Sequence, residues 1–357
     1  MKQIVHIIDS LRCDGAQRML TELLTRLDSQ QFEARVIALT GSGNDYIYQQ
    51  LQAAGIEVEI IQERGVGMRS FFQLMRLLKR WRPDIVHTHL FFSDVWGAAA
   101  CKLAGVPVLV STEHNINRDF NRTKLVFKRK AYRKCDAIIA ISQAVKEYIV
   151  ELDSKNQCKV RLIYNGIDLS RFSAKKTPTM LHQPPVISII GRLEEQKGHA
   201  QAIAAFAQVK GAVDLHIIGQ GSLQLALEQQ VQQIGLKNRV QFLGQRIDIE
   251  QVYADSDIIF IPSRFEGFGL VAVEAMAAGK PIVASRVDGL AEILQHEKTA
   301  LLVDMQQPKT VAQQIDRLLA EPTLRAHLGA TAKQDAQRFD IAKTVEQYQQ
   351  LYKELTT

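Results

Sequence analysis

The sequence predicts an α/β protein made of two domains, each with a doubly wound parallel sheet. Short apolar runs rich in β-branched residues alternate with longer runs of helical periodicity along the whole chain. This alternation is typical of parallel sheets that carry helices on both faces. The length of 357 residues exceeds what one hydrophobic core usually organises, so two domains are expected.

The first half begins with an apolar run at 3–8 and continues with a stretch at 16–27 whose apolar residues recur at helical spacing. The same alternation runs to the end of this half. Further strands are expected at 34–39, 56–61, 84–87, 108–111, 137–141 and 159–163. Further helices are expected near 46–54, 69–81, 94–104 and 143–150.

The second half repeats the pattern after a polar, proline-rich stretch at 174–185, which has the composition of a linker. Its strands are expected at 186–190, 213–218, 240–243, 257–261, 281–284 and 300–303. We therefore expect one domain over 1–175 and a second over 185–343. A last helix is expected within 344–357.

The composition excludes several classes of protein. Hydrophobic residues make up 46% and charged residues 23%, as in ordinary globular proteins. No run approaches the roughly 20 apolar residues of a membrane span. The first apolar run is too short for a secretory signal. The four cysteines are scattered without a CxxC pair, which favours a reducing cytoplasm over a disulfide framework or a zinc knuckle.

The charge is uneven along the chain. Residues 1–176 carry 27 Lys and Arg against 18 Asp and Glu, whereas the remainder carries 17 against 20. The excess is concentrated between Arg118 and Lys134, where basic residues alternate with apolar ones at helical spacing. Such a segment is expected to contact anionic lipid or an anionic acceptor, with a merely solvated basic helix as the alternative. Nucleic acid is not expected, because no nucleic-acid-binding motif accompanies the basic run.

The most informative segment is a glycine-rich turn that follows the expected strand at 257–261 and opens into an apolar helix containing Glu274. The turn reads Glu266-Gly267-Phe268-Gly269-Leu270. Anions bind at such junctions because backbone N–H groups and the helix dipole converge there, and glycine lets the backbone approach a ligand. The two carboxylates could hold hydroxyl groups on either side of a bound phosphate, as in a sugar nucleotide. The alternative is a solvated helix cap.

Glu266 through Glu274 resembles the E-x7-E motif of retaining glycosyltransferases with the GT-B architecture, and the chain is most similar to glycosyltransferase family 4. The flanking sequences Ser-Arg-Phe-Glu-Gly-Phe-Gly-Leu and Glu-Ala-Met-Ala-Ala-Gly-Lys-Pro-Ile-Val-Ala make this match specific. The resemblance covers nearly the whole chain. It implies two facing Rossmann-like domains, with the acceptor bound by 1–175 and the nucleotide-sugar donor by 185–343. It also implies that the helix in 344–357 packs back on the N-terminal domain.

The resemblance further implies which residues act on the donor. Arg192 and Lys197 match the family's Gly-Arg…Lys-Gly segment, whose two cations stabilise the departing diphosphate without a metal. His114 matches a histidine that lies against the donor sugar; a generic buried or surface histidine is the alternative. The implied catalytic residues are thus His114, Glu266, Arg192 and Lys197. The implied donor-binding residues are Gly15, Ala16, Arg192, Lys197, Gly219, Arg246, Glu266, Gly267, Phe268, Gly269, Leu270 and Glu274.

No metal is expected in the site. Asp255-Ser256-Asp257 has the form of a DxD metal motif, but it lies between a helix and a buried strand, where capping is the better interpretation. His87 and His89 share one face of a strand, yet no third ligand with metal spacing stands near them in the sequence. Both histidines are therefore expected to line the site and contact the acceptor.

The function expected from the resemblance is retaining transfer from a nucleoside-diphosphate sugar, expected to be a UDP-sugar, to a saccharide. The acceptor is expected to be lipid-linked, at the cytoplasmic face of the membrane, in bacterial surface polysaccharide, capsule or lipopolysaccharide assembly. No cofactor besides the donor is expected. A sugar-nucleotide epimerase of the same fold and a non-catalytic sugar-binding or scaffold protein are the alternatives. An NAD-dependent oxidoreductase is less favoured, because Gln224 stands where the dinucleotide fingerprint needs a glycine.

Overall fold

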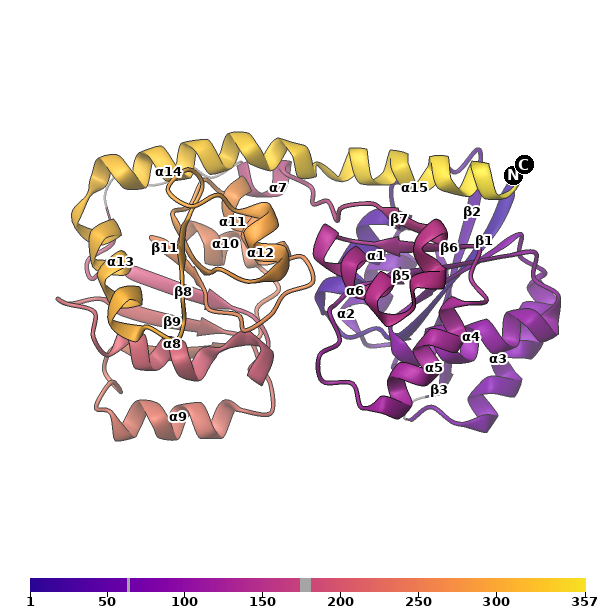
Figure 1. Cartoon of the computed structure of the whole chain (residues 1–357), viewed down its shortest axis with the longest axis horizontal. Coiled ribbons are helices and arrows are strands. Elements are labelled where there is room, and N and C mark those ends of the chain that lie inside the picture. The colour runs from indigo at the N-terminus through magenta and orange to yellow at the C-terminus, as the bar shows by residue number, and fades with distance from the viewer. Residues whose placement is uncertain (63–64, 174–180) are drawn as a thin grey trace. The chain divides into compact units, whose positions relative to one another are not determined.

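A computed structural model of the chain describes residues 1–62, 65–173 and 181–357 (Figure 1). It divides into two compact units. Unit 1 comprises Met1–Gly166 and Ile341–Thr357, and unit 2 comprises Ile167–Asp340. Each unit has a parallel sheet with helices between its strands, so the predicted fold class of two parallel α/β domains is confirmed. Most of the predicted linker, 174–180, lies outside the described residues.

Unit 1 contains a seven-stranded parallel sheet in the order β3-β2-β1-β4-β5-β6-β7. Its strands are β1 (Lys2–Ser10), β2 (Phe32–Thr40), β3 (Glu57–Gln62), β4 (Ile85–His89), β5 (Val108–Glu113), β6 (Ala137–Ala140) and β7 (Val160–Leu162). Strands β4, β5 and β6 are buried along their whole length, as expected for a sheet covered on both faces. The strand order reverses between β1 and β4, and open α/β sheets bind ligands at the carboxyl ends of the strands near such a point.

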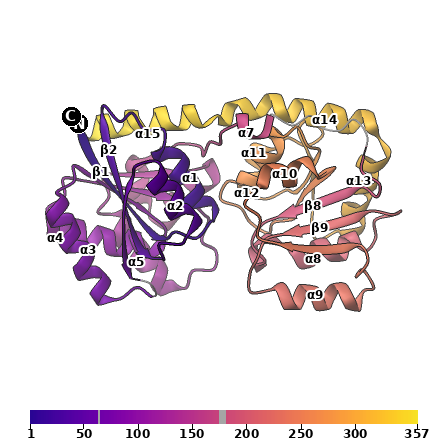
Figure 2. The same cartoon turned by 180° about the vertical axis from the view of Figure 1, so that it is seen from behind.

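The helices of unit 1 follow its strands. They are α1 (Gly15–Leu24), α2 (Tyr46–Ala53), α3 (Met68–Trp81), α4 (Phe91–Ala104), α5 (Arg122–Tyr132), α6 (Gln143–Leu152), the 3₁₀ turn η1 (Ser154–Lys159) and α15 (Ile341–Leu355). The last of these, α15, packs Val345, Tyr348 and Tyr352 into the core of unit 1. The two chain ends therefore lie side by side (Figures 1 and 2), where Lys2 Nζ donates to the Thr356 carbonyl at 3.3 Å.

Unit 2 contains a six-stranded parallel sheet in the order β10-β9-β8-β11-β12-β13. Its strands are β8 (Val186–Ile190), β9 (Asp214–Ile218), β10 (Val240–Gly244), β11 (Ile258–Ile261), β12 (Ile282–Ser285) and β13 (Leu301–Val303). Its helices are α7 (Ser170–Ser173), η2 (Glu195–Lys197), α8 (His199–Phe206), α9 (Gln224–Gln233), α10 (Ile249–Ala254), α11 (Leu270–Ala277), α12 (Asp288–Ile293), α13 (Pro308–Ala320), α14 (Pro322–Asp335) and η3 (Ala336–Phe339). Its order reverses between β8 and β11.

The structure places the division between the units earlier than the sequence predicts. Unit 2 begins at Ile167, whose N–H donates to the Phe339 carbonyl at 3.0 Å. The following helix α7 contacts α10 and α11, and Phe172 packs edge-on against Tyr253 at 5.5 Å. Residues 167–173 therefore belong to the second unit, because their packing and backbone pairing lie there. Among the described helices, none combines the length and the apolarity that crossing a bilayer requires.

Candidate functional site

The loops that follow β8, β9 and β10 are tied together at the carboxyl end of the unit 2 sheet. The N–H of Gly191 donates to the Ile218 carbonyl at 2.9 Å, and the N–H of Gly219 donates to the Gly244 carbonyl at 2.8 Å. A Cβ on Gly219 would lie 1.9 Å from the Gly191 carbonyl oxygen, so this approach requires glycine. The predicted residues Arg192, Gly219 and Arg246 thus follow three neighbouring strands.

Lys197 and Glu266, which lie 69 residues apart in the sequence, meet in this region. Lys197 Nζ donates to Glu266 Oε1, which also accepts from Ser263 Oγ at 2.8 Å. Glu266 is only 7% exposed. The carboxylate is therefore fixed by two donors. Since an ammonium group has three N–H donors, Lys197 can bind Glu266 and an anion at the same time.

The turn from Glu266 to Leu270 leads directly into α11. Gly269 is the N-cap of this helix and has a φ of 99°, which favours glycine. A Cβ at Gly289 would lie 2.6 Å from the Gly267 carbonyl oxygen, so α12 approaches the turn closely. The first N–H groups of a helix have no partner within it and carry its positive partial charge. The turn is therefore suited to bind an anion.

Phe268 contributes to this turn differently from the polar residues. Its side chain is 2% exposed and packs edge-on against Phe339 at 5.5 Å. The ring belongs to the core of unit 2. A contact with a donor at this predicted position would therefore come from the backbone.

Glu274 lies within α11 and is 2% exposed. Its Oε2 accepts a hydrogen bond from the Tyr253 hydroxyl at 2.8 Å, and the same hydroxyl is 3.2 Å from the Val271 carbonyl. Tyr253 comes from α10 and is itself buried. Tyr253 was not predicted from the sequence, since nothing in its local pattern indicates that it holds the second glutamate.

Two arginines lie in the loops after the strands. Arg192 is exposed in the turn after β8. Arg246 lies after β10, and its Nε donates to Asp248 Oδ1 at 2.7 Å. Both partners of this ion pair are exposed, so it contributes little to stability and leaves the arginine able to exchange partners.

The DxD-like segment serves the fold. Asp257 Oδ2 accepts from the Val186 N–H at 2.7 Å, and Oδ1 lies 3.0 Å from His182 Nδ1. Asp257 thus holds the first residue of β8, and Asp255 is the C-cap of α10. Asp255 Oδ1 accepts from Gln251 Nε2 at 2.5 Å within the same turn.

In unit 1, Gly15 and Ala16 form the first turn of α1, where Asp14 is the N-cap without a side-chain capping bond. The loop before this helix is anchored by Asp9, which accepts from the backbone N–H of Ser93 at 2.6 Å and of Phe92 at 3.1 Å. Burial raises the pKa of Asp9 to about 6, against the hydrogen bonds from Ser93 and Phe92, which lower it. Asp9 therefore ties the predicted donor loop to the start of α4.

His114 lies after β5 at the end of a row of three imidazoles. Its Nε2 is 3.0 Å from His89 Nδ1, and His89 Nε2 is 3.0 Å from His6 Nδ1. His6 and His89 are buried on β1 and β4, the strands between which the sheet order reverses. Burial lowers the pKa of His6 to about 3 and of His114 to about 4, and it lowers the pKa of His89 well below its ordinary value. The three rings are therefore neutral near pH 7.

His87 stacks on His89 with 4.4 Å between ring centroids. Its ring nitrogens lie 2.7 Å from the hydroxyls of Tyr352 and Thr112. No third ligand with metal spacing stands near His87 and His89 in the sequence, but the fold brings His6 beside them. Ligand nitrogens of the three lie within 4.8 Å of one another. The nitrogens of His87 and His89 are nevertheless engaged in hydrogen bonds, so binding a metal would require breaking them.

Lys128 is the one member of the predicted basic surface that the structure removes from it. Its side chain is 1% exposed, and its Nζ lies 2.7 Å from Asp94 Oδ2 and 2.9 Å from Glu113 Oε2. The Tyr132 hydroxyl donates to Glu113 at 2.6 Å. The prediction that Lys128 contacts an anionic surface is therefore wrong: it pairs with two buried carboxylates, one of them adjacent to His114.

The remaining basic side chains on α5 are exposed, and the same helix and the start of α4 also carry exposed apolar side chains. Val126 is 44% and Phe127 is 47% exposed, and Phe92 at the start of α4 is 43% exposed. The exposed basic residues of the helix are Arg122, Lys124, Arg129 and Lys130. We call these seven residues the α5 surface. It combines positive charge with apolar side chains.

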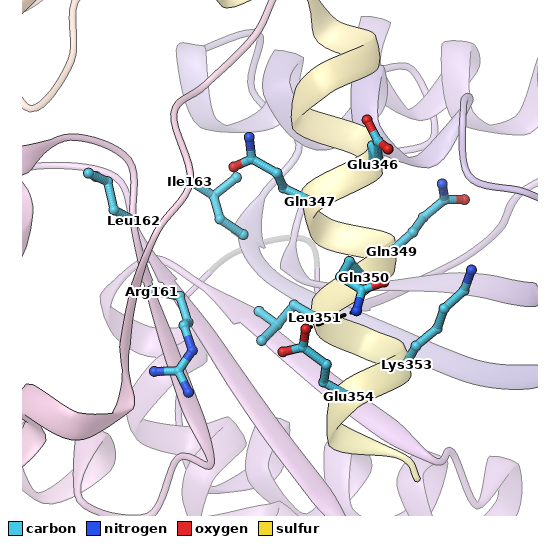
Figure 3. Close-up of a pocket in the computed structure, with 10 residues that line it drawn as sticks. All are labelled: Arg161, Leu162, Ile163, Glu346, Gln347, Gln349, Gln350, Leu351, Lys353 and Glu354. Atoms are coloured by element: carbon cyan, nitrogen blue, oxygen red, sulfur yellow. Dashed lines mark hydrogen bonds between the residues drawn. The ribbon is translucent and has the colours of Figure 1, made fainter.

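A groove of about 490 Å³ lies between β7 and α15 on unit 1 (Figure 3). Arg161, Leu162 and Ile163 line one side, and side chains of α15 between Glu346 and Glu354 line the other. None of the residues predicted for the site lines it. The groove therefore carries no part of the candidate chemistry.

Comparisons with known proteins agree with the two-unit fold. The family model described as glycosyl transferases group 1 matches residues 171–335, and the model described as Glycosyltransferase Family 4 matches residues 13–171. An uncharacterized glycosyltransferase of Methanocaldococcus jannaschii, MJ1607, is 30% identical over 71% of this chain and 70% of its own length.

Two further proteins match almost end to end. A UDP-Gal:alpha-D-GlcNAc-diphosphoundecaprenol alpha-1,3-galactosyltransferase of Escherichia coli is 26% identical over 98% of this chain and 96% of its own. The crystal structure of Anabaena HepE in complex with UDP and glucose superposes with a TM-score of 0.89 at 25% identity, covering 99% of this chain and 100% of that one.

Proposed function

Because the chain belongs to glycosyltransferase family 4 and is a group 1 glycosyltransferase acting on a sugar donor, we propose that its donor is a UDP-sugar and its acceptor a lipid-linked saccharide. The observation that carries the donor proposal is the junction of Lys197, Glu266 and the N-terminus of α11. It gathers a cation, a fixed carboxylate and backbone N–H groups at the carboxyl end of the unit 2 sheet. The anion it suits best is a diphosphate.

The relatives support uracil as the base. HepE was crystallised with UDP and glucose and also with UDP-glucose, and the E. coli relative is named for UDP-Gal. In our proposal, Glu274 accepts hydrogen bonds from the ribose hydroxyls, and Tyr253 holds its carboxylate in place. The backbone around Gly219 and Arg246 surrounds the base. We further propose that His114 contacts the donor sugar and that Gly15 and Ala16 contact the donor.

The proposed reaction is a front-face displacement with retention. The bond between the anomeric carbon and the β-phosphate oxygen breaks, and an acceptor hydroxyl oxygen bonds to the same face of that carbon. The hydroxyl proton passes to the departing phosphate oxygen. Arg192 and Lys197 stabilise the negative charge that develops on the diphosphate, so no metal is required in this proposal.

The proposed acceptor is a saccharide on a polyprenyl diphosphate, and the process is assembly of a bacterial surface polysaccharide, capsule or lipopolysaccharide. The E. coli relative matches nearly the whole chain, and its name contains diphosphoundecaprenol, which supports a polyprenyl diphosphate acceptor. The α5 surface supports attachment to the inner face of the membrane, because basic side chains attract anionic lipid while Val126, Phe127 and Phe92 can enter the interface.

Liposome co-sedimentation tests the membrane part of the proposal. Replacing Arg122, Lys124, Arg129 and Lys130 with Gln should reduce binding to anionic vesicles, because each basic residue near the surface contributes about 1 kcal/mol. The control replaces four exposed lysines of unit 2 with Gln and removes the same charge. These are Lys210, Lys237, Lys298 and Lys309. Equal sedimentation of the two variants would contradict attachment through α5.

A nucleotide-release assay tests the donor. The protein is incubated with a panel of UDP-, GDP- and ADP-sugars, with and without polyprenyl diphosphate saccharides. We expect UDP release that depends on both a UDP-sugar and the acceptor, and that falls in Glu266→Gln. Release from GDP- or ADP-sugars alone would contradict the proposed base.

A further inference from the structure

We propose that His6 and His89 are positioning residues that hold His114 in a single tautomer, with its proton on Nδ1. The row of hydrogen bonds from His6 through His89 to His114 joins three elements that are far apart in the sequence, β1, β4 and the end of β5. Ring centroids of successive members are 5.3 Å apart. No sequence pattern specifies this row.

The tautomers of the three rings depend on one another. A neutral imidazole has one N–H donor and one lone pair. Both nitrogens of His89 are used, so if it accepts from His6 it must donate to His114, and the reverse also holds. Only two arrangements of the whole row are therefore possible. In one the protons point from His6 towards His114, and in the other they point from His114 towards His6.

The buried end of the row decides between the two arrangements. His6 Nε2 is enclosed and has no hydrogen-bond partner among the residues that the structure describes. If the protons pointed inward, this nitrogen would carry an N–H with no acceptor, whereas the outward arrangement leaves only a lone pair there. Buried donors without an acceptor are rarer in proteins than acceptors without a donor. We therefore assign N–H donors to His6 Nδ1 and His89 Nδ1, and the lone pair to His114 Nε2.

His114 then presents an N–H at Nδ1. This part rests on the proposed function, since it places a hydrogen-bond donor against a hydroxyl oxygen of the donor sugar. A lone pair at that position would instead need a hydroxyl proton. The buried row thus determines whether the site donates to the sugar or accepts from it, although His6 and His89 lie in the core of the sheet.

Imidazole nitrogen NMR on protein labelled with ¹⁵N-histidine tests the assignment without any assay of activity. His114 peaks are identified from a His114→Gln sample. We expect Nδ1 in the protonated range and Nε2 in the lone-pair range near pH 7. The opposite pattern, an equal mixture of tautomers, or spectra of the histidine row that change on chelation of metal, would overturn the proposal.

Variants of His6 test the dependence of His114 on its distant partner. His6→Phe keeps a ring but removes the donor, so His114 should lose its single tautomer. His6→Asn keeps an N–H near the Nδ1 position and should retain it. The control is His87→Phe, which removes an equally buried imidazole that bonds hydroxyls instead of this row. An unchanged His114 spectrum in folded His6→Phe would contradict the proposal, and the wild-type spectrum remains decisive if that variant does not fold.

Calorimetry separates this inference from the proposed function. We expect His6→Phe to weaken binding of the UDP-sugar about 5–10-fold, the effect of one net hydrogen bond, and to leave the affinity for UDP unchanged. If the NMR result holds but UDP-sugar affinity does not change, the row orders His114 but His114 does not touch the sugar. If the NMR result fails, the positioning role is wrong whatever the donor proves to be.

Discussion

Lys128→Met should destabilise unit 1 strongly, because it leaves two buried carboxylates without their cation. The ammonium lies 2.7 Å from Asp94 and 2.9 Å from Glu113, and all three side chains are no more than 3% exposed. Removing one partner from such a buried group costs about 3–5 kcal/mol, since the remaining charge stays out of water. Methionine fills a similar volume, so little of this loss comes from a cavity.

Urea denaturation followed by tryptophan fluorescence measures this loss. The two tryptophans, Trp81 and Trp96, both lie in unit 1, so their signal reports on the unit that contains Lys128. Lys130→Met on the same helix is the control. Because Lys130 is exposed, its replacement should change the free energy of unfolding by less than about 0.5 kcal/mol.

The pH dependence of the stability loss tests whether the loss arises from the two buried carboxylates. In the wild type, burial raises the pKa of Glu113. Lys128 and the hydrogen bond from Tyr132 lower it by more, so the net shift is downward. Burial also raises the pKa of Asp94, and there Lys128 offsets only part of the shift. Without Lys128, burial holds both carboxyl pKa values above their unfolded values, and the folded variant binds protons more tightly. The stability that the variant loses relative to the wild type should therefore become smaller as the pH falls from 7 towards about 5. A loss below about 1 kcal/mol, or one independent of pH, would refute the reasoning.

Three further predictions concern the donor site. Arg192→Ala should lower kcat about 10²-fold, as expected for the loss of one preorganised donor, while the wild type should keep its activity in EDTA; loss with EDTA and rescue by magnesium or manganese would contradict the metal-free proposal. Glu274→Gln should weaken UDP binding in calorimetry by about 1.5–3 kcal/mol, the value of a charged hydrogen bond; unchanged affinity would exclude the ribose contact. Gly219→Ala should lower the thermal midpoint and impair UDP binding more than Gly235→Ala, because both glycines have positive φ but only Gly219 faces a carbonyl within 1.9 Å.

The sequence predicts the fold well because the local spacing of apolar residues marks the strands and helices of each α/β unit. Both sheets and the turn from Glu266 to Gly269 lie where the apolar runs and the glycines place them. The division between the units was less predictable. Residues 167–173 read as the end of the first half, and it is their packing on α10 and α11 and the backbone bond of Ile167 to Phe339 that assign them to unit 2.

The candidate site was less predictable wherever partners come from distant strands. His6 joins His87 and His89 because β1 and β4 are neighbours in the sheet, and strand order cannot be read from the spacing of histidines. Lys128 carries a partial signal, since it shares a helical face with the buried Tyr132 four positions later. Its partner Glu113 lies on β5, and this pairing cannot be recognised from the sequence. The charge of Lys128 therefore led to the prediction that it is exposed.

Product analysis tests the central claim most directly. The protein is given a UDP-sugar with an α-linked nucleotide and a saccharide on polyprenyl diphosphate, and the new linkage is examined by NMR. We predict a lipid-linked product that is one sugar longer and α-linked, and that is not formed by Lys197→Ala. A β-linked product would contradict retention. Transfer only to water or to free saccharides would contradict the lipid-linked acceptor.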